Sequence, residues 1–420
     1  MSVTVVVMNQ TLRLNDNRAL ALASDYGDPI LPMVIFPHRL WSKQWFLYPS
    51  MGPHRRSFLV QALLGLEKNI QENGGQLWAS NEDPKIALQK VFQSMNVQRV
   101  IGTCSVGHYE KQMEADINQI SRENNINVAW VWDHTLHHPK ILPFPISDTP
   151  NSFSKFRKYV EKLPVEAPIN NGGINFFNKQ PPYDITNAFV LHEQNIPIKE
   201  TLCEDDAHAH LRTYIWESKA ILHYKNTRNL SIGDHVSTKF SVWLSLGILS
   251  ARTIAHEIKL FEKNVKKNSS TYWVIFELLW RDFFQFQCEK QGIRWYQFGG
   301  IQGLENAPPT YDENTFNAWR TGQTPEPFVN AHMKELITTG YMSNRGRQVV
   351  ASYLIHNLNQ DWRRGAEVFE HFLIDYDVAS NIGNWMYIAG CGNSQTKRIF
   401  NIQNQQEKYD PGQKYVNKWL

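Results

Sequence analysis

Four short clusters in the second half of the chain combine carboxylates, amides, guanidinium groups and aromatic rings, the side chains that bind flat or anionic ligands. The first, Glu277-x-x-Trp280-Arg281, lies in the apolar stretch 272–286, which predicts a buried helix. Glu277 and Arg281 are one helical turn apart, so an internal ion pair is one interpretation. In the other, Glu277 and Trp280 share a face and form a pocket wall that stacks and hydrogen-bonds a flat ligand.

The second cluster covers residues 341–348 and places Asn344, Arg345 and Arg347 at the start of a predicted helix. One interpretation is a basic helix start that faces solvent. The other is a set of guanidinium contacts to a phosphate or a cofactor.

The third cluster begins with Asp375 and Asp377 and continues through Asn381 and Trp385 to Tyr387. Two carboxylates, an amide and two aromatic rings within one segment exceed what packing requires. The segment therefore indicates a ligand site.

The fourth cluster, residues 233–241, places Ser237, Thr238 and Ser241 ahead of the apolar run 242–249, as at the start of a helix. Free backbone N–H groups at such a start attract phosphate. Helix capping by Ser237 or Thr238 is the simpler interpretation of the hydroxyl groups.

The first third of the chain alternates strands and helices, as a parallel sheet requires. Runs rich in β-branched residues predict strands at 3–8, 30–36, 76–79, 97–102 and 127–132. Helical spacing predicts a helix over 54–72, and Pro84 opens another. We therefore expect an α/β domain over 1–133, a doubly wound parallel sheet covered on both faces. No G-x-G-x-x-G follows the first strand, so this sheet lacks the dinucleotide-binding signature.

Residues 134–197 are rich in Pro, Asn and Gly, and only 153–163 has helical spacing. This stretch is predicted to be a long linker wrapped on the surface. After it the pattern is helical and aromatic, which predicts an all-α domain over 198–420.

The composition excludes several classes of protein. The 43 basic and 40 acidic residues give a net charge of +3, and 42% of residues are hydrophobic, as in a soluble globular chain. The four cysteines form no C-x-x-C pair, which argues against a metal cluster and suits a reducing cytoplasm. No apolar run approaches the ~18 residues of a membrane helix. We therefore expect a cytoplasmic protein without a metal.

The four clusters, together with Asp361-Trp362-Arg363, match in order and spacing a known family. The sequence resembles the flavin domain of the photolyase/cryptochrome family. The segments 149–157, 237–241 and 342–348, and Tyr387 where many photolyases have Trp, are similar to its DASH branch. The resemblance spans nearly the whole chain.

The resemblance implies a noncovalent FAD folded into a U in the helical domain. It assigns FAD binding to Tyr224, Ser237, Thr238, Lys239, Phe240, Ser241, Glu277, Arg281, Asn344, Arg347, Asp375, Tyr376, Asp377 and Asn381. It assigns catalysis to Glu277, Trp280, Asn344 and Tyr387. It assigns DNA contacts to Arg228, Trp280, Arg345 and Tyr387, and electron transfer to Trp362 and Trp385. Glu114 is the candidate contact for a folate (methenyltetrahydrofolate) antenna.

The activity that the resemblance implies is blue-light-driven repair of cyclobutane pyrimidine dimers, mainly in single-stranded DNA, by an electron from reduced FAD. The expected partner is damaged DNA, and the expected state is a monomer without a membrane contact. A photoreceptor with little or no repair activity is the alternative. A nucleotide-binding domain without flavin is a third hypothesis.

The chain departs from the family pattern at several positions. The outermost tryptophan of the family's electron-transfer chain aligns with Pro309, which has no π system. Photoreduction of oxidised FAD is therefore expected to be inefficient unless Tyr311 or Trp319 replaces the missing tryptophan. Asn330 and Ile382 also replace residues that are common in the family.

Overall fold

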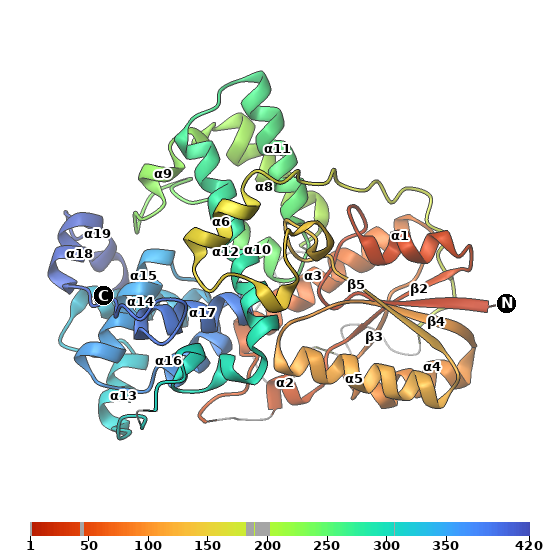
Figure 1. Ribbon diagram of the computed structural model, residues 1–420, viewed down its shortest axis with the longest axis horizontal. Coiled ribbons are helices and arrows are strands. Elements are labelled where there is room, and N and C mark those ends of the chain that lie inside the picture. The colour runs from red at the N-terminus through yellow and green to blue at the C-terminus, as the bar shows by residue number, and fades with distance from the viewer. Residues whose placement is uncertain (1, 43–45, 182–188, 190–201, 306) are drawn as a thin grey trace.

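The computed structural model describes residues 2–42, 46–181, 189, 202–305 and 307–420. An α/β part and a helical part lie side by side, and the linker and helices α10, α11 and α12 run along their junction (Figure 1). The two-part architecture predicted from the sequence is confirmed.

The sheet has five parallel strands in the order β3-β2-β1-β4-β5. The strands are β1 (Ser2–Val7), β2 (Ile30–Ile35), β3 (Trp78–Ser80), β4 (Asn96–Thr103) and β5 (Asn127–Val131). Strands β1 and β2 are almost wholly buried, because helices cover both faces of the sheet. The order reverses between β1 and β4, so the connections that leave the carboxyl ends of these two strands run in opposite directions and leave a crevice outside the sheet.

Two helices pack on each face of the sheet. Helices α1 (Arg18–Asp25) and α3 (Pro53–Glu72) share one apolar core with Val6 and Ile30. Helices α4 (Pro84–Ser94) and α5 (His108–Glu123) share the other core with Val5 and Leu31. The side-chain alternation along each strand supplies both cores.

The linker follows the surface and is anchored at several points. It contains η1 (Pro139–Ile141), η2 (Ile146–Asp148) and α6 (Phe153–Val160). Asp282 of α12 accepts hydrogen bonds from the backbone N–H groups of Leu136 and His137, at 2.8 and 2.9 Å. Phe176 then forms a parallel bridge with Ile30 of β2. Of the predicted linker, residues 182–188 and 190–197 lie outside the described residues, as does residue 198, where the helical domain was expected to begin.

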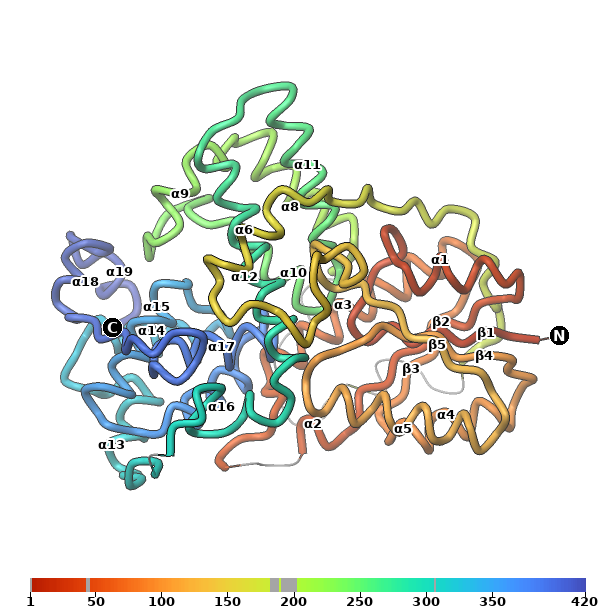
Figure 2. Tube along the Cα trace, viewed as in Figure 1, coloured from red at the N-terminus to blue at the C-terminus, as the bar shows by residue number. Residues whose placement is uncertain are grey.

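The chain path of the helical part winds around the long helix α12 (Ser269–Gln291), which crosses the centre of the molecule (Figure 2). Asn268 caps α12 by accepting from the N–H groups of Ser270 and Thr271. The other α-helices that follow the linker are α8 (Glu204–Arg212), α9 (Tyr224–Thr227), α10 (Phe240–Ser245), α11 (Ala251–Asn264), α13 (Glu313–Arg320), α14 (Pro327–Thr339), α15 (Asn344–Ser352), α16 (Trp362–Phe372), α17 (Val378–Ala389), α18 (Ile402–Tyr409) and α19 (Lys414–Trp419). None of the helices in the described residues could cross a membrane.

A buried ion-pair network joins the two parts. Arg13, after β1, donates to Asp133 at 2.7 Å, and Arg252 of α11 donates to Asp133 at 2.6 Å and to Asp16 at 2.9 Å. All four side chains are at most 3% exposed. Because breaking a buried pair leaves an uncompensated charge, the network fixes how the two parts meet.

Candidate flavin site

A pocket of about 80 Å³ lies between α15, α16 and α17. Its polar lining comes from the second and third sequence clusters: Asn344, Arg347, Asp375, Tyr376, Asp377 and Asn381. Its apolar lining includes Phe369, Leu373, Trp385 and Ile388. An apolar wall with polar groups at one edge suits a flat heteroaromatic ring.

Arg347 and Asp375 form the central ion pair of this pocket. Arg347 Nη2 donates to both Asp375 carboxylate oxygens, at 2.9 and 2.8 Å, and Ser241 Oγ donates to Asp375 Oδ2 at 2.7 Å. Burial lowers the pKa of Arg347, but attraction to Asp375 outweighs burial and keeps that pKa above its usual value. The fourth cluster therefore meets the second and third at one carboxylate.

Asp377 and Asn381 are held by hydrogen bonds at the start of α17. Asp377 caps the helix by accepting from Ser380 N at 2.7 Å, and Gln285 Nε2 donates to its other oxygen at 2.6 Å. Asn381 Nδ2 donates to the carbonyl oxygen of Ala366 at 3.0 Å. Because this bond uses the side-chain nitrogen, it fixes the orientation of the Asn381 amide group.

The segment 237–241 turns sharply before α10. Lys239 is the N-cap residue with φ of +50°, and its own side chain makes no capping bond. Thr238 Oγ1 accepts from the N–H of Phe240, the first residue of α10, at 3.4 Å, so the capping interpretation is confirmed for Thr238, which acts from the position before the N-cap. The Phe240 ring is buried against Tyr214, so its side chain belongs to the core. Tyr224, at the start of α9, is also buried.

The Glu277–Arg281 ion pair proposed from helical spacing does not form. Glu277 Oε1 instead accepts from Arg228 Nη1 at 2.6 Å, and Arg281 donates to the carbonyl oxygen of His134 in the linker. Each of the two side chains therefore pairs with a group of a neighbouring element and not with the other residue of its own helix. Burial raises the pKa of Glu277, and Arg228 opposes that rise.

Trp280 of α12 and Tyr387 of α17 are partly exposed rings in contact with each other, and the surface that they form with Glu277 is called the aromatic opening. Phe153 stacks on Trp280 with centroids 3.7 Å apart, and Tyr387 meets it edge to face at 6.3 Å. Arg398 lies over the Tyr387 ring at 4.9 Å. Arg345 is engaged elsewhere, over Tyr409 at 4.9 Å, and burial lowers its pKa.

Comparison with known proteins gives a family for this geometry. A model described as "DNA photolyase" matches residues 4–170, and one described as "FAD binding domain of DNA photolyase" matches residues 273–420. Cryptochrome DASH of Xenopus laevis is 37% identical, over 100% of this chain and 82% of its own. Cryptochrome DASH of Synechocystis sp. is 38% identical, over 99% of this chain and 87% of its own. A crystal structure of Synechocystis cryptochrome superposes with a TM-score of 0.93 at 36% identity, covering all of this chain and 89% of that one.

The chain belongs to the photolyase/cryptochrome family. Its DASH relatives confirm the branch that the sequence resembles, and its helical part is an FAD-binding domain. The pocket fits a flavin by its own chemistry: the buried Trp385 Nε1 has no hydrogen-bond partner among the described residues, and a ring with acceptor atoms would supply one. The pocket between α15, α16 and α17 is therefore the candidate site for the isoalloxazine ring.

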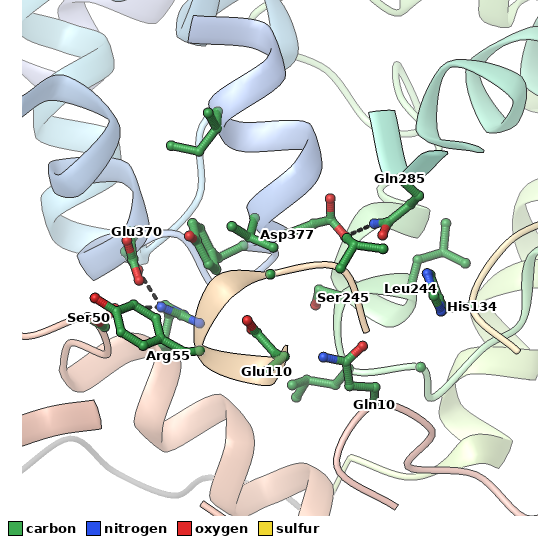
Figure 3. A pocket seen from close by; sticks show the side chains of 18 of the residues that line it. Gln10, Ser50, Arg55, Glu110, His134, Leu244, Ser245, Gln285, Glu370 and Asp377 are labelled. Atoms are coloured by element: carbon green, nitrogen blue, oxygen red, sulfur yellow. Dashed lines mark hydrogen bonds between the residues drawn. The ribbon is translucent and has the colours of Figure 1, made fainter. Parts of the chain in front are cut away.

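A second, larger cavity of about 440 Å³ lies between the family's two domains. It opens at the carboxyl ends of β1 and β4, where the strand order reverses, and is lined there by Gln10 and Glu110. Figure 3 shows Glu110 between Arg55 and Gln10, with Asp377 and Gln285 on the far side. Tyr376 and Asp377 line both cavities, so the two sites are neighbours.

Buried ionisable groups of opposite sign line this cavity. Burial raises the pKa of Glu110, and raises that of Glu370 to about 7, while it lowers the pKa of Arg55. Arg55 also lies over the Tyr376 ring, 4.4 Å from its centroid. A ligand here would meet carboxyl groups that both donate and accept hydrogen bonds.

Glu114, the antenna residue proposed from the sequence, does not line this cavity. It accepts from the N–H of Ser105 at 2.6 Å and pairs with Lys111. Glu110, one helical turn earlier, is the carboxyl group that the fold turns into the cavity. Sequence reasoning missed it, although a carboxyl group in the first turn after a buried strand was a usable signal.

Proposed function

We propose that this chain is a light-driven enzyme that repairs cyclobutane pyrimidine dimers, mainly in single-stranded DNA, with reduced FAD. The observation that carries the proposal is the position of Glu277, Trp280 and Tyr387. Helix α12 presents the first two at the aromatic opening, and α17, which also lines the flavin pocket, presents Tyr387. The pyrimidine dimer, two adjacent bases of one strand joined by a cyclobutane ring, would therefore lie beside the flavin.

Bound reduced FAD supplies the excited-state electron that splits the dimer. The Arg347–Asp375 pair, Ser241, Asp377 and Asn381 would hold that cofactor, since they lie in or beside the pocket between α15, α16 and α17. Glu277 donates a hydrogen bond to the dimer as a protonated carboxyl group, which its burial favours. Trp280 offers an aromatic face for stacking.

The opening also carries the charge that a DNA backbone requires. Lys225 and Arg228 lie over the Trp273 ring at 4.7 and 5.5 Å, next to Glu277. Cations interleaved with aromatic rings suit single-stranded nucleic acid. A dimer in a single strand also avoids the few kcal/mol that flipping a base out of a duplex costs.

The experiment that tests this function illuminates chemically reduced protein with a dimer-containing oligonucleotide and follows the recovery of thymine absorbance. Recovery on single strands, with much less on duplex, supports the proposal. Bound, photoreducible flavin without any recovery would instead support the photoreceptor alternative. A colourless protein that takes up no added FAD would refute both.

We also infer that a folate antenna binds in the interdomain cavity, with Glu110 rather than Glu114 as its contact. A carboxyl group facing a pterin pairs with the ring's amino and ring N–H groups. Chromophore extraction tests this inference, with Glu110→Gln as the test variant and Glu114→Gln as the matched control. Equal folate content in the two variants would refute the assignment.

A further inference from the structure

A continuous line of aromatic rings leads from the flavin pocket to the surface. Trp385, in the pocket lining, contacts Trp319 of α13, with ring centroids 6.3 Å apart at an interplanar angle of 75°. Phe316 lies 5.7 Å from Trp319, and Tyr311 lies 5.8 Å from Phe316. These four residues are called the Tyr311 path below.

Burial changes along the path as an electron relay requires. The rings of Trp385, Trp319 and Phe316 are at most 2% exposed, whereas Tyr311 is 37% exposed. The guanidinium group of Arg364 lies 3.8 Å from the Tyr311 centroid. This cation disfavours a positive charge on the Tyr311 ring and favours release of its phenolic proton on oxidation.

Trp362, which lines the interdomain cavity and not the flavin pocket, makes no ring contact of this kind within the described residues. Trp362 is 2% exposed and donates through Nε1 to the carbonyl oxygen of Phe298 at 3.0 Å. Pro309, at which the resemblance predicted the outer tryptophan, has no π system. A phenylalanine such as Phe298 is much harder to oxidise than tryptophan or tyrosine. Phe298 therefore cannot pass an electron to an oxidised Trp362.

We propose that the Tyr311 path is the route by which light reduces the oxidised flavin of this chain. The proposal rests on the FAD binding stated above. Trp385 would give one electron to the photoexcited flavin. Trp319 would then give one electron to the oxidised Trp385, and Tyr311 would give one electron to the oxidised Trp319 past the Phe316 ring. Oxidised Tyr311 loses its proton to water, which leaves a neutral tyrosyl radical. A small thiol outside then restores Tyr311 by giving one electron and one proton, and two such thiyl radicals combine into a disulfide.

The test compares blue-light reduction of oxidised, flavin-loaded protein with dithiothreitol as donor, in the parent and in single variants. Tyr311→Phe and Trp319→Phe should each slow flavin reduction several-fold. Time-resolved absorption or electron paramagnetic resonance should detect a tyrosyl radical in the parent, and Tyr311→Phe should abolish it. Flavin absorbance and the melting temperature verify that Trp319→Phe, a core substitution, still folds.

Tyr26→Phe is the matched control, because Tyr26 is 49% exposed and Arg99 lies 3.9 Å over its ring, in the α/β part. It should leave the rate and the radical unchanged. Parent-rate reduction in Tyr311→Phe with loss of reduction in Trp362→Phe, or a parent that forms no tyrosyl radical, would overturn the proposal. Dimer repair by chemically reduced protein does not use the path, so failed repair alongside fast photoreduction would refute the repair function alone.

Discussion

Arg228 Nη1 donates to Glu277 Oε1 at 2.6 Å, so two side chains expected to contact different parts of a DNA substrate neutralise each other in its absence. The pair lies at the aromatic opening, with both side chains partly exposed. A DNA phosphate would compete with Glu277 for Arg228. Binding of the strand would then release the carboxyl group from its cation and raise its pKa further.

Glu277→Gln should keep FAD and DNA binding but lower the quantum yield of repair, because the amide preserves the shape and loses the acid proton. The quantum yield on a single-stranded dimer substrate measures this. Glu262→Gln, at the end of α11, is the matched control and should repair at the parent level. An unchanged quantum yield in Glu277→Gln would show that Glu277 is only a structural partner of Arg228.

The Arg228–Glu277 pair also predicts a pH dependence. Repair needs the acid form of Glu277, so the yield should fall as pH rises through the pKa of Glu277, which burial already raises. Arg228→Leu removes the one cation that opposes this rise. The falling limb of the pH profile should therefore move to higher pH in Arg228→Leu, although DNA binding weakens. A limb that stays in place, or moves to lower pH, would contradict the assignment.

Trp280→Ala should weaken binding of a dimer-containing oligonucleotide by about 1–3 kcal/mol, the scale of stacking between a base and an aromatic side chain. Phe153 supports one face of Trp280 at 3.7 Å and should keep the indole in place for the substrate. Fluorescence anisotropy measures the dissociation constant. Trp419→Ala, on the C-terminal helix α19, is the control and should bind like the parent. Equal affinities for all three proteins would place the substrate elsewhere.

Asp375→Ala should lose flavin and destabilise the fold by about 3 kcal/mol, the lower end of the range for a broken buried pair, because it leaves the partly buried Arg347 without its partner. Flavin absorbance and chemical denaturation measure the two effects. Asp361→Ala removes the N-cap of α16 and should cost only about 1 kcal/mol without loss of flavin. Comparable losses of flavin and of stability in the two variants would show that the Arg347–Asp375 pair matters no more than the Asp361 cap.

Glu370→Gln should stabilise the protein at high pH more than at low pH. The folded-state pKa of Glu370 is raised to about 7 by burial, above its usual 4.5. Between these values the unfolded chain releases a proton that the folded chain keeps, so the parent loses stability as pH rises through about 7. The amide removes this penalty. Melting temperatures at about pH 5 and about pH 8 measure the effect, with the exposed Glu407→Gln as control.

Local chemistry in the sequence determined the elements. The predicted strand 30–36 is β2 (Ile30–Ile35), and the predicted helix 54–72 is α3 (Pro53–Glu72). Periodicity and Pro or Gly boundaries report backbone preferences that hold within a few residues of chain, so these predictions needed no tertiary information. The motifs of the helical part indicated a flavin site only through their resemblance to the photolyase/cryptochrome family.

Only the tertiary structure decided which side chains pair. Helical spacing predicted an ion pair between Glu277 and Arg281, but Glu277 pairs with Arg228, which lies 49 residues away in the sequence. Sequence reasoning named Glu114, but the packing of α5 against the sheet turned Glu110 into the interdomain cavity and paired Glu114 with Ser105. It also named Tyr311 and Trp319 without saying whether they touch anything near the flavin, and the ring contacts of Trp319 decided that. A side chain pairs with the most favourable group near it in the folded chain. Which groups are near it depends on how elements that are distant in sequence pack together.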